Sequence, residues 1–126
     1  MRAADTNVLV RLITRDDETQ VASAEAFVLR GAWVSHVVLA ETMWVLEAAY
    51  DLAHGEIATA IEMLLNHESL TIQDGEVVVA ALEQYRRRPS LGFSDCLVLE
   101  IARKAGHIPL GTFDKRLAKL EGTALL

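Results

Sequence analysis

Four acidic residues stand in settings that favour metal chemistry, namely Asp5, Glu41, Asp95 and Asp114. Glu41 has apolar residues three and four positions away in both directions, which are its neighbours on a helix, and no lysine or arginine is among them. Asp95 has a similar apolar setting. A buried carboxylate must be paired, protonated or bound to a cation, because burying a lone charge is costly. Glu41 and Asp95 therefore predict a bound cation.

Asp5 and Asp114 occupy a second kind of position, the point at which a strand gives way to a helix. Asp5 follows a short apolar start and precedes a polar pair and an apolar run. Asp114 follows the short run at residues 108–111 and opens a predicted last helix at residues 114–120. Open α/β folds bind ligands at the carboxyl ends of their strands. Both acids are thus expected at a ligand-binding edge.

The elements that must position these acids alternate along the chain. Short apolar runs predict strands at residues 2–4, 32–34, 70–72, 108–111 and 123–125. Helical patterns lie at residues 8–13, 18–29, 36–49, 55–66, 76–87, 94–105 and 114–120. No strand shows the alternation of a half-exposed strand, which favours buried parallel strands. The expected fold class is α/β, with a central, mostly parallel sheet of about five short strands flanked by helices.

Composition sets the size and the setting of the protein. A chain of 126 residues that is 52% hydrophobic suits a single domain, residues 1–126, with a core of its own. The only cysteine, Cys96, excludes an internal disulfide. The sequence shows no signal segment and no apolar run long enough to span a membrane. We therefore expect a cytoplasmic protein without a membrane partner.

Charge is distributed unevenly along the chain. The net charge is −6, yet residues 1–85 carry 4 basic and 14 acidic side chains while residues 86–126 carry 8 basic and 4 acidic ones. A basic C-terminal third favours a polyanionic substrate met by one surface. The alternative for Arg86, Arg87 and Arg88 is that they close a helix, where cations stabilise the helix dipole.

Several carboxylates at one sheet edge predict hard-metal chemistry. Oxygen ligands select Mg²⁺ or Mn²⁺, and the scattered histidines and single cysteine do not form a zinc motif. A divalent cation held by carboxylates polarises a phosphate and lowers the pKa of a bound water. Phosphodiester hydrolysis is the reaction that this arrangement suits best.

Four segments together resemble the successive motifs of PIN-domain ribonucleases. They are the opening Ala3-Ala4-Asp5-Thr6-Asn7-Val8-Leu9-Val10-Arg11, then Leu39-Ala40-Glu41-Thr42, Gly92-Phe93-Ser94-Asp95-Cys96-Leu97 and Gly111-Thr112-Phe113-Asp114. The chain is most similar to the VapC toxins of bacterial toxin-antitoxin pairs. The resemblance covers essentially the whole chain, and its specificity lies in the combination and order of the four segments.

The resemblance implies a PIN-like three-layer sandwich and Mg²⁺-dependent endonucleolytic cleavage of RNA. It also implies a small antitoxin as a protein partner, and a homodimer. Asp5, Glu41, Asp95 and Asp114 match the four family acids and are the expected catalytic and metal-binding residues. Thr6, Asn7 and Thr112 would orient those carboxylates or contact a phosphate.

Other interpretations stay open. Asp114 or Asn7 could be a helix cap, and Glu100 is expected to be a surface residue because Arg103 and Lys104 follow three and four positions on. The protein could be a catalytically silent module that binds RNA or antitoxin. It could also be an aspartate-based phosphoryl-transfer domain, with Asp74 as a receiver-like acceptor, although the phosphatase version needs an acid where Asn7 stands.

Overall fold

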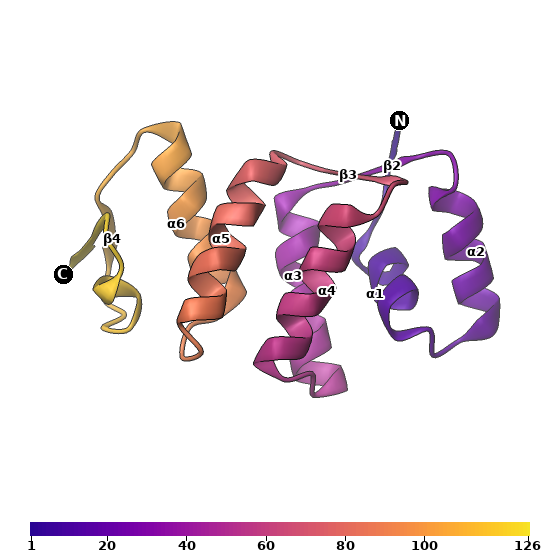
Figure 1. The fold of residues 1–126 in the computed structure, drawn as a ribbon, viewed down its shortest axis with the longest axis horizontal. Coiled ribbons are helices and arrows are strands. Elements are labelled where there is room, and N and C mark those ends of the chain that lie inside the picture. The colour runs from indigo at the N-terminus through magenta and orange to yellow at the C-terminus, as the bar shows by residue number, and fades with distance from the viewer. The chain divides into compact units, whose positions relative to one another are not determined.

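The computed structural model describes all residues from 1 to 126 and divides the chain into two compact units (Figure 1). The N-terminal unit is Met1–Gly75 and the C-terminal unit is Glu76–Leu126. Neither contains a helix that is long and apolar enough to cross a membrane. Each unit has its own parallel strand pairing and is described separately below.

The N-terminal unit is built around three parallel strands in the order β1 (Arg2–Ala3), β2 (Ala32–Val34) and β3 (Leu70–Ile72). Helices α1 (Thr6–Thr14) and α2 (Glu18–Val28) connect β1 to β2, and α3 (His36–Tyr50) and α4 (His54–Asn66) connect β2 to β3. α1 packs against α2 and α3, and α4 packs against β3 and α3. Parallel strands need such crossovers, because a tight hairpin cannot join them.

Strand register places the carboxyl ends of these strands at one edge of the sheet. Ala3 is level with Trp33, which is level with Thr71. The pairing continues past the strands, since the amide of Ala4 donates to the Trp33 carbonyl at 2.9 Å and the amide of Gln73 donates to the Val34 carbonyl at 2.8 Å. The residues that follow the strands, Asp5 among them, therefore lie along a single edge.

Apolar residues at helical spacing hold the helices on this sheet. α4 buries Ile57, Ile61 and Leu64, while α3 buries Leu39, Met43 and Leu46. Residues three and four positions apart share one helix face, so each set forms a continuous buried stripe. Burial of each large aliphatic side chain contributes about 1.5–3 kcal/mol. That burial compensates for the small number of hydrogen bonds that such short strands make.

The C-terminal unit contains α5 (Gly75–Arg87), α6 (Phe93–Ala105) and two parallel strands, β4 (Leu110–Thr112) and β5 (Thr123–Leu125). Tyr85 at the end of α5 meets Phe93 at the start of α6 edge to face, with ring centroids 6.0 Å apart. Arg103 of α6 donates through Nη2 to the Glu121 carbonyl at 2.7 Å. It thereby ties the helix to the turn before β5.

The structure confirms the α/β class and most of the predicted elements. The strands at residues 32–34, 70–72 and 123–125 have the predicted bounds. β4 begins two residues later than predicted because Pro109 has no amide hydrogen, so the ladder starts with the Leu110 amide. The five strands are divided between two sheets, three in one unit and two in the other.

The predicted helix at residues 114–120 is wrong. The structure has a single 3-10 turn at Leu117–Lys119, which ends where Leu120 turns to an extended conformation. This segment has buried apolar residues only at Leu117 and Leu120, spaced by the three residues of one 3-10 turn. The apolar pattern is too short to support a longer helix.

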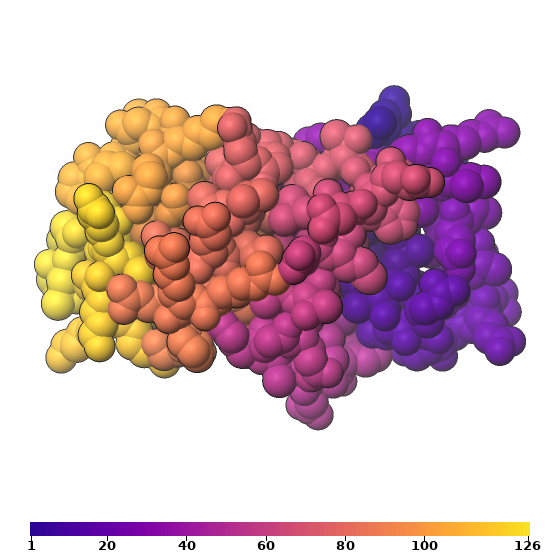
Figure 2. Space-filling model, viewed as in Figure 1, coloured from indigo at the N-terminus to yellow at the C-terminus, as the bar shows by residue number.

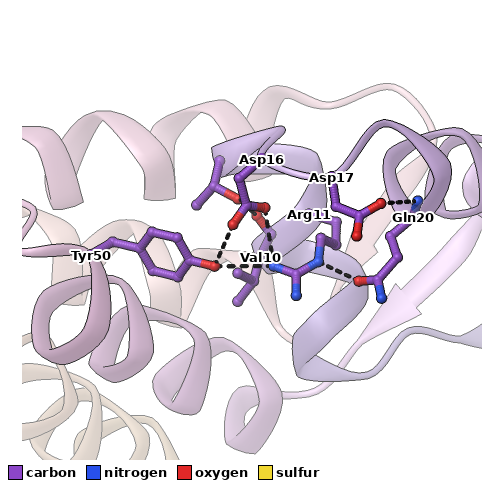
Figure 3. A network of polar contacts seen from close by, with 7 residues as sticks. Val10, Arg11, Asp16, Asp17, Gln20 and Tyr50 are labelled. Atoms are coloured by element: carbon purple, nitrogen blue, oxygen red, sulfur yellow. Dashed lines mark hydrogen bonds and ion pairs between the residues drawn. The ribbon is translucent and has the colours of Figure 1, made fainter.

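A polar network closes the N-terminal unit at the end of α3 (Figure 3). Asp16 accepts hydrogen bonds from Thr14 Oγ1 at 2.8 Å, Tyr50 Oη at 2.9 Å and Arg11 Nη1 at 3.1 Å. The hydrogen bonds from Thr14 and Tyr50 are the main reasons why the pKa of Asp16 lies below its usual 3.8. The network joins α1, the loop that follows it and the C-terminal end of α3.

Tyr50→Phe removes the hydroxyl of this network and keeps the ring. We expect the thermal midpoint at pH 7 to fall by about 2–5 °C. Because the folded-state pKa of Asp16 is lowered, the stabilisation is present at neutral pH and is lost as the pH falls below about 4. The difference between variant and parent should therefore shrink in acid. Thermal unfolding at pH 7 and pH 3 measures both effects, and equal midpoints at pH 7 would contradict the role of the network.

Candidate active site

Asp5 joins β1 to α1 and caps the helix. Its backbone is extended, and its Oδ1 accepts a hydrogen bond from the Thr6 amide at 2.7 Å. The Asp5 side chain is exposed, whereas Thr6 is only 4% exposed and its Oγ1 has no hydrogen-bond partner. Asn7 is exposed in the same first turn. The edge after β1 thus combines a carboxylate, a buried hydroxyl and an accessible amide within three residues.

Glu41 lies in the second turn of α3, whose N-cap Ser35 directly follows β2. The structure corrects the expected burial of this acid. The buried stripe of α3 runs through Leu39, Met43 and Leu46, while Trp44 is 69% exposed and Glu41 itself is exposed. Val37 beside Glu41 is exposed as well, so the burial argument for its metal role does not hold. Its carboxylate makes no hydrogen bond or ion pair within the chain.

Asp95 stands in the first turn of α6, which begins after the extended N-cap Gly92. Its side chain is half-buried and has no basic partner. A carboxylate in the first turn of a helix is stabilised by the positive end of the helix dipole. The Asp95 carboxylate thus lies at the amino end of α6 with no lysine or arginine covering it.

Asp114 follows β4 and opens the turn that leads into the 3-10 helix. Its Oδ1 accepts hydrogen bonds from the amides of Arg116 at 2.8 Å and Leu117 at 3.2 Å, and these bonds lower the pKa of the carboxyl group. Thr112 Oγ1 accepts a hydrogen bond from the Asp114 amide at 3.0 Å. The Asp114 side chain thus holds the turn that leads into the 3-10 helix, whose N-cap is Arg116, and Thr112 fixes the backbone that carries Asp114.

Each unit contributes two of the four acids. Asp5 and Glu41 belong to the N-terminal unit, and Asp95 and Asp114 belong to the C-terminal unit. Within either unit, no three histidine, cysteine, aspartate or glutamate side chains lie close enough together to hold a metal ion. The donor chemistry fits a hard cation, since Asp5, Glu41 and Asp95 offer carboxylate oxygens that no basic residue occupies.

Glu100 is a second acid whose burial the sequence analysis predicted wrongly. Its side chain is 7% exposed, and it accepts a hydrogen bond from Arg103 Nε at 3.1 Å through Oε1, while Oε2 is buried without a partner. The burial of Glu100 could have been predicted from its spacing along the helix. Glu100 lies seven residues after Phe93 and three after Leu97, which places it on the buried face of α6. The positions of Arg103 and Lys104 had favoured an exposed pair instead.

A comparison with known protein families shows to which family this chain belongs. The PIN domain matches residues 3–122, which is nearly the whole chain. The chain belongs to the PIN domain family. PIN domains generally have a nuclease fold, and the nucleases among them usually use divalent metal ions. Neither the curated proteins nor the solved structures contain a match to this chain.

Cys96, next to Asp95 in this PIN domain, provides a test of local packing. The thiol is fully buried, and burial, followed by the charges of Asp95 and Glu100, raises its pKa to about 11. We expect almost no reaction of the native protein with a disulfide reagent at pH 8, and one fast equivalent in denaturant. Absorbance of the released thiolate measures both. Rapid reaction of the native thiol would show that the first turns of α6 open readily.

Proposed function

We propose that this PIN domain is a Mg²⁺-dependent endoribonuclease whose single domain spans residues 1–126. The observation that carries the proposal is the unpaired state of three acids. Asp5, Glu41 and Asp95 have no basic partner, whereas Asp16, Glu25, Glu76, Glu100 and also Asp114 each form an ion pair. Carboxylates kept free of lysine and arginine are available to a cation.

Asp5 and Asp95 would hold the metal directly. Glu41 would act as a further ligand or through a bound water, and Asp114 would close the site from the end of β4. A divalent ion bound there would polarise a substrate phosphate and lower the pKa of a bound water. Mn²⁺ would substitute for Mg²⁺. The chain's own groups do the positioning: Asp5 is fixed by the Thr6 amide, and Thr112 fixes the backbone of Asp114. Thr6 and Asn7 would orient a carboxylate or contact a phosphate, and of the two side chains only Asn7 is exposed.

RNA is the proposed substrate because the basic residues lie in the C-terminal third. Arg87, Arg88, Lys115 and Lys119 are all exposed there. Exposed lysine and arginine supply most of the affinity of proteins for a phosphate backbone. Water attack on phosphorus with cleavage of the bond to the 3′ oxygen would leave a 5′-phosphate and a 3′-hydroxyl.

The biological role that we propose is that of a VapC-type toxin, a homodimer held inactive by a small antitoxin. The four motif segments support this role, since they resemble VapC toxins in the same order along the chain. A PIN module that binds RNA or antitoxin without turnover is the alternative outcome of the experiment below. No observation favours the aspartate-based phosphoryl-transfer alternative, because Asn7 stands where the phosphatase version needs an acid.

Cleavage of a panel of structured RNAs tests the proposal. Purified protein, freed of any bound partner, is assayed with Mg²⁺ and with chelator, alongside Asp5→Asn, Asp95→Asn and the control Asp51→Asn. Asp51 is exposed and left-handed (φ 54°), a conformation that asparagine tolerates well. We expect at least about a hundredfold loss in the two site variants and none in the control. A folded, metal-loaded parent that cleaves no RNA would favour the silent module.

Asp114→Asn separates the two roles of that residue. Asparagine caps a helix about as well as aspartate, so the thermal midpoint should change little. Loss of the charge should nevertheless lower the cleavage rate by about tenfold or more if Asp114 serves the metal. Thermal unfolding and the rate at saturating Mg²⁺ measure the two effects. Full activity of the stable variant would leave Asp114 as a cap alone.

A further inference from the structure

Phe113 lies in the bend between β4 and the 3-10 turn of the C-terminal unit, directly before Asp114. Its side chain is 80% exposed, which makes it the most exposed aromatic residue of the chain. Its ring makes no aromatic or cation–π contact within the chain. The segment from β4 onward, yellow at the left of Figure 2, lies at the surface of its unit. The ring therefore adds almost no buried area to the folded unit.

Hydrogen bonds on both sides of Phe113 fix the backbone that presents the ring. Before it, the Thr112 carbonyl accepts a hydrogen bond from the Leu126 amide at 2.9 Å. After it, the Asp114 amide donates to Thr112 Oγ1 at 3.0 Å, and the Asp114 carbonyl accepts from the Ala118 amide at 3.0 Å. A ring on a fixed backbone loses little conformational entropy when a flat partner covers it, so Phe113 is preorganised for such a partner.

Basic side chains follow this ring closely in the sequence. Residues 113–119 contain three basic residues, Lys115, Arg116 and Lys119, and one acid, Asp114. All three basic residues are exposed, and Lys115 and Lys119 form no ion pair within the chain. Arg116 faces Asp114 at 3.8 Å, a separation longer than a hydrogen bond. Single-stranded nucleic acids bind to surfaces of this kind, with phosphates on the cations and bases on the exposed ring.

The other strongly exposed aromatic residue has a different electrostatic setting. Trp44 of α3 is 69% exposed, but acidic residues stand three positions away on both sides, at Glu41 and Glu47. No lysine or arginine lies within four positions of Trp44 in the sequence. A phosphate backbone would meet negative charge there, so the charge distribution favours Phe113 as the ring that meets a nucleic acid.

We propose that Phe113 is a stacking platform for an unpaired base of single-stranded RNA, with Lys115 and Lys119 binding the adjoining phosphates. The proposal rests on RNA as the proposed substrate and names the side chains that receive it. Every base has a π face, so this contact selects unpaired RNA rather than a particular sequence. Asp114, which follows Phe113 directly, is one of the proposed catalytic acids. The stacked base therefore belongs to a nucleotide close to the bond that is cut.

Equilibrium dialysis of short RNAs in chelator tests the stacking contact apart from cleavage. Pentauridylate is compared with a pentamer whose sugars carry no base, so that both ligands have the same phosphates. Both are labelled with a radioactive 5′-phosphate, which avoids an aromatic dye. Phe113→Leu should weaken the binding of pentauridylate by about fivefold or more and leave the abasic pentamer unchanged. Phe113→Tyr keeps a ring and should bind both ligands as the parent does.

Two further variants separate stacking from charge and from a general loss of apolar surface. Lys115→Gln should weaken both pentamers alike and reduce the slope of log affinity against log salt by about 0.7, whereas Phe113→Leu should leave the slope unchanged. Val79→Ala truncates an exposed apolar residue of α5 that stands between Glu76 and Glu83, and it should change neither quantity. Thermal unfolding should give every variant the midpoint of the parent, because each replaced side chain is exposed.

Three results would overturn the proposal: no binding of pentauridylate by the parent, unchanged binding by Phe113→Leu, or an equal loss of both pentamers in that variant. The last result would mean that the ring meets something other than a base. Because nothing is cleaved in chelator, the proposed nuclease is judged separately. A parent that cleaves RNA without dependence on the ring keeps the nuclease and loses the platform, and a parent that binds through the ring but cleaves nothing with Mg²⁺ does the reverse.

Discussion

The N-terminal unit depends on the parallel pairing of three very short strands. β1 contributes only two residues, both exposed, and β2 and β3 contribute three each, so the backbone groups of the sheet are few and its buried part is limited to Ala32, Val34 and Leu70. Bonds beyond the strand ends, from the Ala4 and Gln73 amides, complete the pairing. The same register brings the ends of the strands to one edge. The position of Asp5 is therefore a consequence of the hydrogen bonding that makes the sheet possible, and any change that slips the register moves the acid.

The acids of this chain that have a partner are held in different ways. Some acids accept hydrogen bonds from basic side chains or hydroxyl groups. Asp16, for example, accepts them from Thr14, Tyr50 and Arg11. Asp5 and Asp95 instead rely on backbone amides and helix ends, which stabilise a carboxylate without covering it. Such support leaves oxygens free for a cation. Glu100 belongs to neither group, because one of its oxygens is paired and the other is buried and unpaired.

Arg103 connects two parts of the C-terminal unit through its hydrogen bonds. It reaches from α6 to Glu100 on one side and to the Glu121 carbonyl on the other. The turn that it reaches requires glycine, since Gly122 has φ +92° and a Cβ there would lie 2.9 Å from Arg103 Nη1. A single side chain thus couples the helix and the entry to β5. This coupling is why a surface-like sequence pattern, an acid followed by two basic residues, encodes a buried contact.

The sequence by itself determined the order and type of the elements, because hydrophobic period and capping residues are local properties. Ser35 caps α3 and Gly106 ends α6, which are residue types that favour those positions, and the motif segments identified the PIN family that residues 3–122 match. Which face of a helix is buried was decided only by tertiary packing. Trp44 and the side chain of Glu41 face outward and Glu100 faces inward, since the neighbouring helices, which are distant in sequence, select the stripe that they cover. The division of the strands into two sheets has the same origin, because strand partners are chosen by contacts between segments that are far apart in the chain.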